Sequence, residues 1–142
     1  MNLSNEVKLT LIKAPTTGAA TGDVVADVLD MQNYQGVLAF ATYGTANSSN
    51  GIKAGMSSAS SSGTMGDMVG TQVAGLSTGG TVWLDIQKPL KRYVQFTLTR
   101  QASAKLSAVY ALQYGARLGP VDNTIADLIT GELHASPTTG TA

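Results

Sequence analysis

The sequence predicts an all-β protein, an antiparallel sandwich or barrel of roughly eight short strands. Stretches in which apolar and polar residues alternate recur along the chain, and a period of two is typical of strands with one buried face. Clusters of Gly, Ser and Thr separate these stretches at near-regular intervals. The 142 residues contain neither an internal repeat nor a linker that divides them, so we expect one folded domain.

Four strands are expected in the first half of the chain. Residues 7–11 alternate cleanly, and residues 23–31 are apolar with interspersed acids. Residues 36–43 form a stronger candidate, and a further strand follows the Asn50-Gly51 dipeptide, which favours a tight turn. In the strand over residues 36–43, one face is expected to hold Leu38 and Phe40, and the other Val37, Ala39 and Ala41. In the next strand, one face is expected to hold Ile52, Ala54 and Met56.

The second half continues the pattern. Short strands are predicted over residues 65–69 and 71–74, and Val82, Leu84 and Ile86 alternate with Trp83 and Asp85. Pro89 interrupts the alternation because it cannot donate to a strand ladder. The clearest strand covers residues 93–99, with Val94, Phe96 and Leu98 opposite Tyr93, Gln95, Thr97 and Thr99. The last covers residues 105–114, with Leu106, Ala108, Tyr110, Leu112 and Tyr114 on one face.

The C-terminal segment has a different character. A short helix is expected over residues 124–130, with Asn123 as its cap and Gly131 as its stop. The remainder lacks periodicity, which favours a tail that either lies over a neighbouring molecule or is partly disordered. We therefore divide the chain into a sandwich domain, residues 1–121, and a C-terminal extension or arm, residues 122–142.

The composition argues against several functions. The chain has no cysteine and a single histidine, His134, so thiolate and histidine chemistry is scarce and we expect no enzyme activity, cofactor or metal. Nine basic residues balance nine acidic ones, which argues against nucleic acid as a partner. No apolar run is long enough for a membrane span. The N-terminus also lacks the layout of a secretion signal.

Two features suggest contact with another molecule. Lys88, Lys91 and Arg92 are the densest charge in the chain and could meet an acidic patch on a partner protein, although a solvated turn explains them equally simply. Trp83 and Tyr93 could form a platform for a sugar. Aromatic residues that flank a strand more often fill the edge of a sandwich or an interface.

Three segments resemble a group of small virion proteins from tailed bacteriophages. Residues 85–94 match a ten-position pattern. It begins with Asp, then Ile or Val, then any residue, a basic residue and Pro, and it continues with any residue, a basic residue, Arg, Tyr, and finally Val or Leu. Residues 111–117 match the pattern Ala, Ile or Leu, Gln, Tyr, Gly, any residue, Arg. Residues 33–37 precede a strand as they do in that group. The resemblance covers about residues 7–121 and is most specific in the second half.

The resemblance implies a capsid cement, or decoration, protein of short-tailed phages, with a jelly-roll-like sandwich. Such a protein is made in the host cytoplasm and bridges neighbouring major capsid proteins on the outer surface of the virion, as a homodimer or alternatively a trimer. We expect the contact residues to be Lys88, Lys91, Arg92, Tyr93, Tyr114 and Arg117. The alternative is another β-sandwich virion component, such as a tail, head-fibre or carbohydrate-binding protein.

Overall fold

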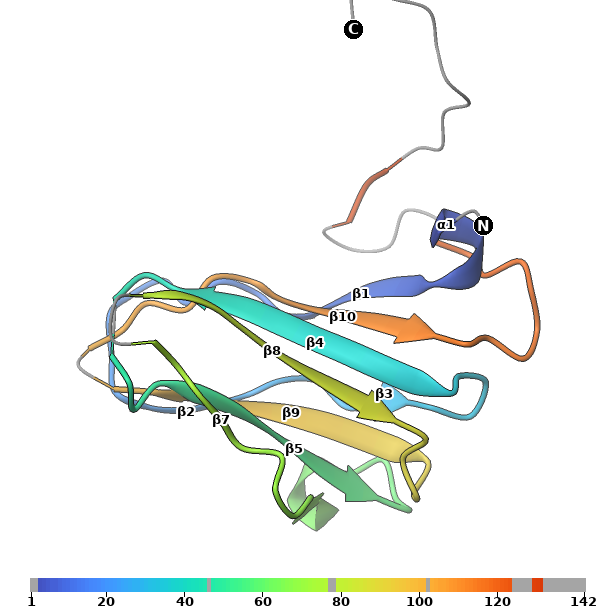
Figure 1. The fold of residues 1–142 in the computed structure, drawn as a ribbon, viewed down its shortest axis with the longest axis horizontal. Helices are drawn as coiled ribbons and strands as arrows, with labels where there is room; N and C mark the ends of the chain where they lie inside the picture. The colour runs from blue at the N-terminus through green and yellow to red at the C-terminus, as the bar shows by residue number, and fades with distance from the viewer. Residues whose placement is uncertain (1–2, 46, 77–78, 102, 124–128, 132–142) are drawn as a thin grey trace, which may run out of the picture.

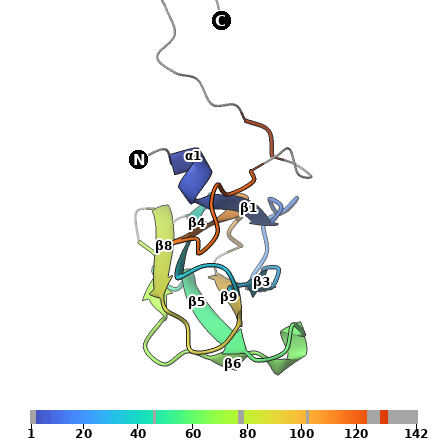
Figure 2. The same ribbon diagram turned by 90° about the vertical axis from the view of Figure 1, so that its right-hand side faces the viewer.

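Two antiparallel sheets pack face to face in the computed structural model of the chain, as two views at 90° show (Figure 1 and Figure 2). This confirms the predicted all-β sandwich. The structure describes residues 3–45, 47–76, 79–101, 103–123 and 129–131. A short helix, α1 (Leu3–Glu6), precedes the first strand and was not predicted. His134 and most of the predicted helix over residues 124–130 lie outside the described residues, as does most of the predicted arm.

One sheet has four strands in the order β1-β10-β4-β8. These are β1 (Lys8–Lys13), β10 (Val109–Tyr114), β4 (Gly36–Tyr43) and β8 (Gly80–Gln87). The bounds of β4 are those that the sequence predicted. β8 alternates between buried and exposed residues along its length, so Val82, Leu84 and Ile86 face the core as expected.

The other sheet has six strands, most of them arranged around a long central pair. Its order is β2-β9-β5-β6, while β3 also pairs with β9 and β7 with β5. A turn of 3-10 helix, Ser62–Thr64, lies between β5 and β6. The strands of this sheet are β2 (Gly22–Val25), β3 (Leu29–Asp30), β5 (Gly51–Ser57), β6 (Gly66–Asp67), β7 (Val73–Ala74) and β9 (Tyr93–Arg100).

The connectivity is that of a jelly roll. β2 and β3 occupy one position beside β9, and β6 and β7 share one position beside β5, so the ten strands fill eight positions. Numbered in chain order, these positions give sheets 1-8-3-6 and 2-7-4-5, the double-sheet arrangement that two Greek keys produce. The predicted jelly-roll-like sandwich of about eight strands is therefore confirmed.

The core lies between the two sheets and consists of small and medium apolar side chains. Val37, Ala39 and Ala41 of β4 contact the six-stranded sheet, where Phe96 and Leu98 of β9 are wholly buried. Leu38 and Phe40, on the opposite face of β4, are only half-buried. Because the inward residues of β4 are so small, the two sheets can approach closely there.

The two faces of β9 alternate as predicted, but one polar residue of the outer face is buried. Gln95 is 5% exposed, although it alternates with the core residues Val94 and Phe96. The side-chain amide nitrogen of Gln95, Nε2, donates to the carbonyl of Ala26 at 2.7 Å, and its Oε1 accepts a hydrogen bond from the hydroxyl of Ser62. The loop after β5 covers this side of the sheet, and the amide can be buried because both of its ends are hydrogen-bonded.

The prediction for β10 is confirmed in part. Tyr110, Leu112 and Tyr114 share one face, which is the outward face, while Val109, Ala111 and Gln113 are buried. Leu106 does not belong to this strand, since it lies before it and bridges Tyr43 at the end of β4. Buried Gln113 is tolerated because its Nε2 donates to the carbonyl of Asp30 at 2.8 Å.

Several predicted strands are shorter than expected. The strand over residues 23–31 is divided into β2 and β3, because the amide of Asp27 turns away to donate to Ile12 of the opposite sheet. The strands over residues 65–69 and 71–74 contract to the two-residue strands β6 and β7. The last strand begins at Val109 instead of residue 105.

Candidate functional site

Three loops meet at one end of the sandwich, the right-hand end in Figure 1. They follow β3, β8 and β10, and backbone hydrogen bonds join them. The amide of Lys88 donates to the carbonyl of Gln35 at 2.6 Å, and that of Arg117 donates to Asn33 at 2.9 Å. Segments that are far apart in the sequence are therefore held together as one surface.

This surface gathers four of the six predicted contact residues. We call Lys88, Lys91, Arg92 and Arg117 the basic rim; with Met31 and Tyr34 they line an open hollow of about 600 Å³. Leu90 also lines the hollow and is 89% exposed, so an apolar side chain stands among the charges. A surface of this kind can meet a partner that offers both carboxylates and an apolar pocket.

Arg92 differs from the other three cations because it is paired within the chain. Its Nε and Nη2 atoms donate to the two carboxylate oxygens of Asp30 at 2.9 and 2.6 Å. These hydrogen bonds lower the pKa of Asp30 below its usual value and raise the pKa of Arg92. The guanidinium also lies 5.1 Å from the centre of the Tyr93 ring. The bidentate fork of Arg92 thus positions the loop.

Lys88, Lys91 and Arg117 are exposed, and none of them has an ion-pair partner among the described residues. Three positive charges of the basic rim are therefore available for a partner. Each exposed pair contributes little to affinity by itself, so their main effect is on orientation and association rate.

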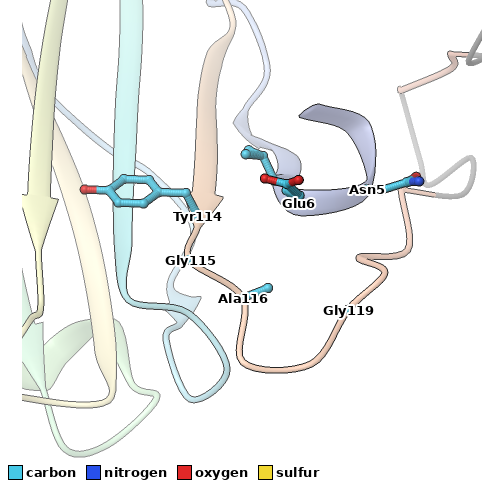
Figure 3. Close-up of a pocket in the computed structure, with 7 residues that line it drawn as sticks. Asn5, Glu6, Tyr114, Gly115, Ala116 and Gly119 are labelled. Carbon is cyan, nitrogen blue, oxygen red and sulfur yellow. The ribbon is translucent and has the colours of Figure 1, made fainter. Parts of the chain in front are cut away.

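Tyr114 lies apart from the basic rim. Figure 3 shows its ring directed across β4, away from Asn5 and Ala116, which line a second hollow of about 410 Å³. Its hydroxyl donates to a carboxylate oxygen of Asp85 on β8 at 2.7 Å. Partial burial, together with this hydrogen bond, raises the pKa of Tyr114 to about 12.

The outward face of the four-stranded sheet is a second candidate surface, which the sequence analysis missed. The register sets apolar residues of all four strands beside one another. The Phe40 and Tyr110 rings stack with centres 5.8 Å apart, and Trp83 is 61% exposed at the β8 edge. We call this set the apolar face: Leu9, Leu11, Leu38, Phe40, Trp83, Tyr110 and Leu112.

The signal for this surface was present in the sequence but ambiguous. Both faces of β4 and of β10 are apolar, so alternation alone does not show which face is the core. The structure assigns the smaller residues to the core and the larger ones to the outside. An apolar sheet face with an exposed tryptophan is typical of a surface that contacts another molecule.

The expected aromatic pair does not form a platform. Trp83 lies on the four-stranded sheet, whereas Tyr93 lies on the six-stranded sheet beneath Arg92. Trp83 lies on the outer side of its sheet, and neither of the two hollows described above includes it. A surface position outside any hollow fits a macromolecular contact better than a small ligand.

No family model matches the chain, and a search of the curated proteins found no match. Within the residues that the structure describes, no cluster of three or more His, Cys, Asp or Glu side chains could hold a metal ion. None of the described helices is long and apolar enough to cross a membrane.

Proposed function

We propose that the chain is a structural virion protein that decorates and cements a phage capsid by bridging neighbouring major capsid proteins on the outer surface of the shell. One observation supports the proposal above the others, namely that a small jelly roll carries two separate surfaces suited to contact with other molecules. The basic rim lies at one end of the sandwich and the apolar face on its side.

Two surfaces on one rigid body are what a bridging role needs. When one surface has bound a capsid subunit, the second meets the neighbouring subunit in an intramolecular step. The resulting effective concentration strengthens overall binding by about 10²–10⁴ without any new contact. The basic rim orients the protein on acidic groups of the shell, and the apolar face supplies buried area.

Docking onto shells that lack the protein tests the role of the basic rim. The variant carrying Lys91→Glu and Arg117→Glu reverses two exposed, unpaired charges from two different loops. We expect about tenfold weaker binding or more in co-sedimentation, because the rim then repels acidic groups on the shell. Arg92 is left intact since its pairing with Asp30 is structural.

Lys105→Glu provides the matched control. Lys105 is also exposed, but it precedes β10 at the opposite end of the sandwich, where its carbonyl accepts a hydrogen bond from the amide of Gly44. This variant should dock like the wild type. Equal docking of the rim variant and the control would show that the basic rim is only solvated.

A deletion experiment tests the cementing role itself. Virions assembled without the protein should release their genome at a lower temperature and after milder osmotic shock, because the shell then lacks its bridges. Adding purified protein back should restore the release temperature. Release that does not depend on the protein would contradict a cement function.

The exposure of Trp83 also favours a second candidate, a virion component that binds carbohydrate. The exposed Thr81 and Asp85 lie on the same side of β8 as Trp83, and an exposed tryptophan with polar groups beside it can stack on a sugar ring. Binding to a glycan array that Trp83→Ala abolishes, with few copies per virion, would support this candidate. High copy number over the whole shell, without glycan binding, would support cementing.

A further inference from the structure

The β8 edge of the four-stranded sheet pairs with no described strand on the side away from β4. The strand is eight residues long and contains no proline and one charged residue, Asp85. Natural sheets usually protect an edge of this length with charges, prolines, bulges or a covering segment, because its free N–H and C=O groups pair readily with another strand. Among the residues that the structure describes, β8 has none of these protections.

The opposite edge of the same sheet shows the contrast. Along β1, the side chain of Asn123 accepts a hydrogen bond from the amide of Leu9 at 3.0 Å and also bonds the carbonyl of Val7. The amide of Val121 donates to Asn5 at 2.8 Å. The chain after β10 therefore covers part of the β1 edge, whereas no described strand pairs with the β8 edge.

We propose that two copies of the chain pair antiparallel through β8, about a two-fold axis that passes through Trp83. The two four-stranded sheets then form one continuous eight-stranded sheet. The inference does not depend on the proposed function, because self-association is a property of the purified chain.

The sequence of β8 is self-complementary in this register. Trp83 lies opposite Trp83 of the second copy, and Thr81 lies opposite Asp85, so a hydroxyl meets a carboxylate twice. The two Asp85 residues are four positions apart, about 13 Å along the strand, so like charges do not meet. Moving the axis by one residue to Leu84 would instead set Trp83 opposite Asp85.

The pairing also places the outward sides of the two four-stranded sheets on the same side of the joined sheet. Residues that face each other across an antiparallel pair lie on the same side, so an axis at Trp83 aligns the outward residues of both copies. The row formed by Leu11, Tyr110, Phe40 and Trp83 then continues into the same row of the second copy. A single apolar surface twice as wide results.

The arrangement also positions the two basic rims. Lys88 directly follows β8, and antiparallel pairing directs the two copies of this end apart. With the axis at Trp83, the two Lys88 residues are ten positions apart, about 33 Å along the strand direction. One dimer therefore presents two basic rims at opposite ends, which suits contact with two different neighbours.

Crosslinking through introduced cysteines maps the register. The chain has no cysteine of its own, so only the introduced thiols can react. Wild-type protein should sediment as a dimer. Trp83→Cys should form a dimer with a short thiol crosslinker, whereas Thr81→Cys and Asp85→Cys alone should not. A mixture of the Thr81→Cys and Asp85→Cys proteins should crosslink, because these positions face each other in the proposed register.

Charge reversal provides the second test. Trp83→Lys and Trp83→Glu should each be monomeric, since like charges then meet at the axis, and mixing them should restore a dimer. Leu90→Glu, an equally drastic change at an exposed residue away from β8, should leave the dimer intact. A monomeric wild type, crosslinks at another position, or failure of the mixed proteins to associate would overturn the proposal.

Discussion

At the scale of single residues, Tyr43 shows how a polar atom holds the two sheets together. Its ring is buried at the end of β4, and its hydroxyl lies 2.6 Å from the carbonyl of Gly51 and 2.9 Å from that of Thr99. Both carbonyls belong to the opposite sheet. One side chain thus closes this end of the sandwich.

Removing this hydroxyl should therefore destabilise the fold. Tyr43→Phe leaves two carbonyls with a lost partner in a buried site, and we expect the free energy of unfolding in urea to fall by about 1–2 kcal/mol. Tyr110→Phe is the matched control, because the Tyr110 hydroxyl makes no hydrogen bond to the described residues. A similar loss in both variants would contradict the role of the Tyr43 hydrogen bonds.

The same residue predicts how stability responds to alkali. Burial raises the pKa of Tyr43 from 10.0 to about 12. Between these values the unfolded chain has lost a proton that the folded chain keeps, so stability falls as the pH rises through this window. Tyr43→Phe should lose less stability than the wild type between pH 10 and 12, as measured by urea unfolding. Tyr114 retains a similar contribution in both proteins.

At the scale of elements, β4 and β10 fit together because a glycine of β4 leaves space for an aromatic ring of β10. Gly36 lies opposite Tyr114 in the register, and a Cβ at residue 36 would overlap the Tyr114 ring. The ring occupies the space above the glycine and reaches Asp85 on β8. Glycine therefore allows one tyrosine to span three strands.

A double-mutant cycle tests this arrangement. Gly36→Ala should destabilise the wild type by about 1–3 kcal/mol, because Tyr114 must move and lose its bond to Asp85. In a Tyr114→Ala background the same change should cost much less. Equal costs in the two backgrounds, measured by urea unfolding, would show that the ring does not depend on the glycine.

At the scale of the whole molecule, the single tryptophan reports on the apolar face. Trp83 is 61% exposed in the single chain and lies on the outward side of its sheet, so acrylamide should reach it in the free protein even when the β8 strands of two copies are paired. If the apolar face contacts the shell, docking should reduce this quenching. A second reporter, Leu90→Trp in a Trp83→Phe background, monitors the basic rim in the same way. Protection of both positions is expected, and protection of neither on docked shells would contradict the two-surface proposal.

Alternation of residue types determined much of the architecture from the sequence alone. β4 and β8 could be predicted as strands because each has one side of small or branched apolar residues. Glycine, proline or polar turns mark the bounds of both strands. The proximity of Lys88, Lys91 and Arg92 could also be predicted, because they lie within five positions of the sequence. Arg117 joined them only through the folding of three loops.

The sequence by itself determined the all-β class, the positions of the long strands and the basic turn, because these depend on periods of two and on local turn chemistry. Only the tertiary structure decided which side of β4 and β10 is the core, how Gln95 is buried, and that Arg92 is paired with Asp30. The physical reason is that these properties depend on what lies opposite a residue, and segments far apart in the chain supply those neighbours.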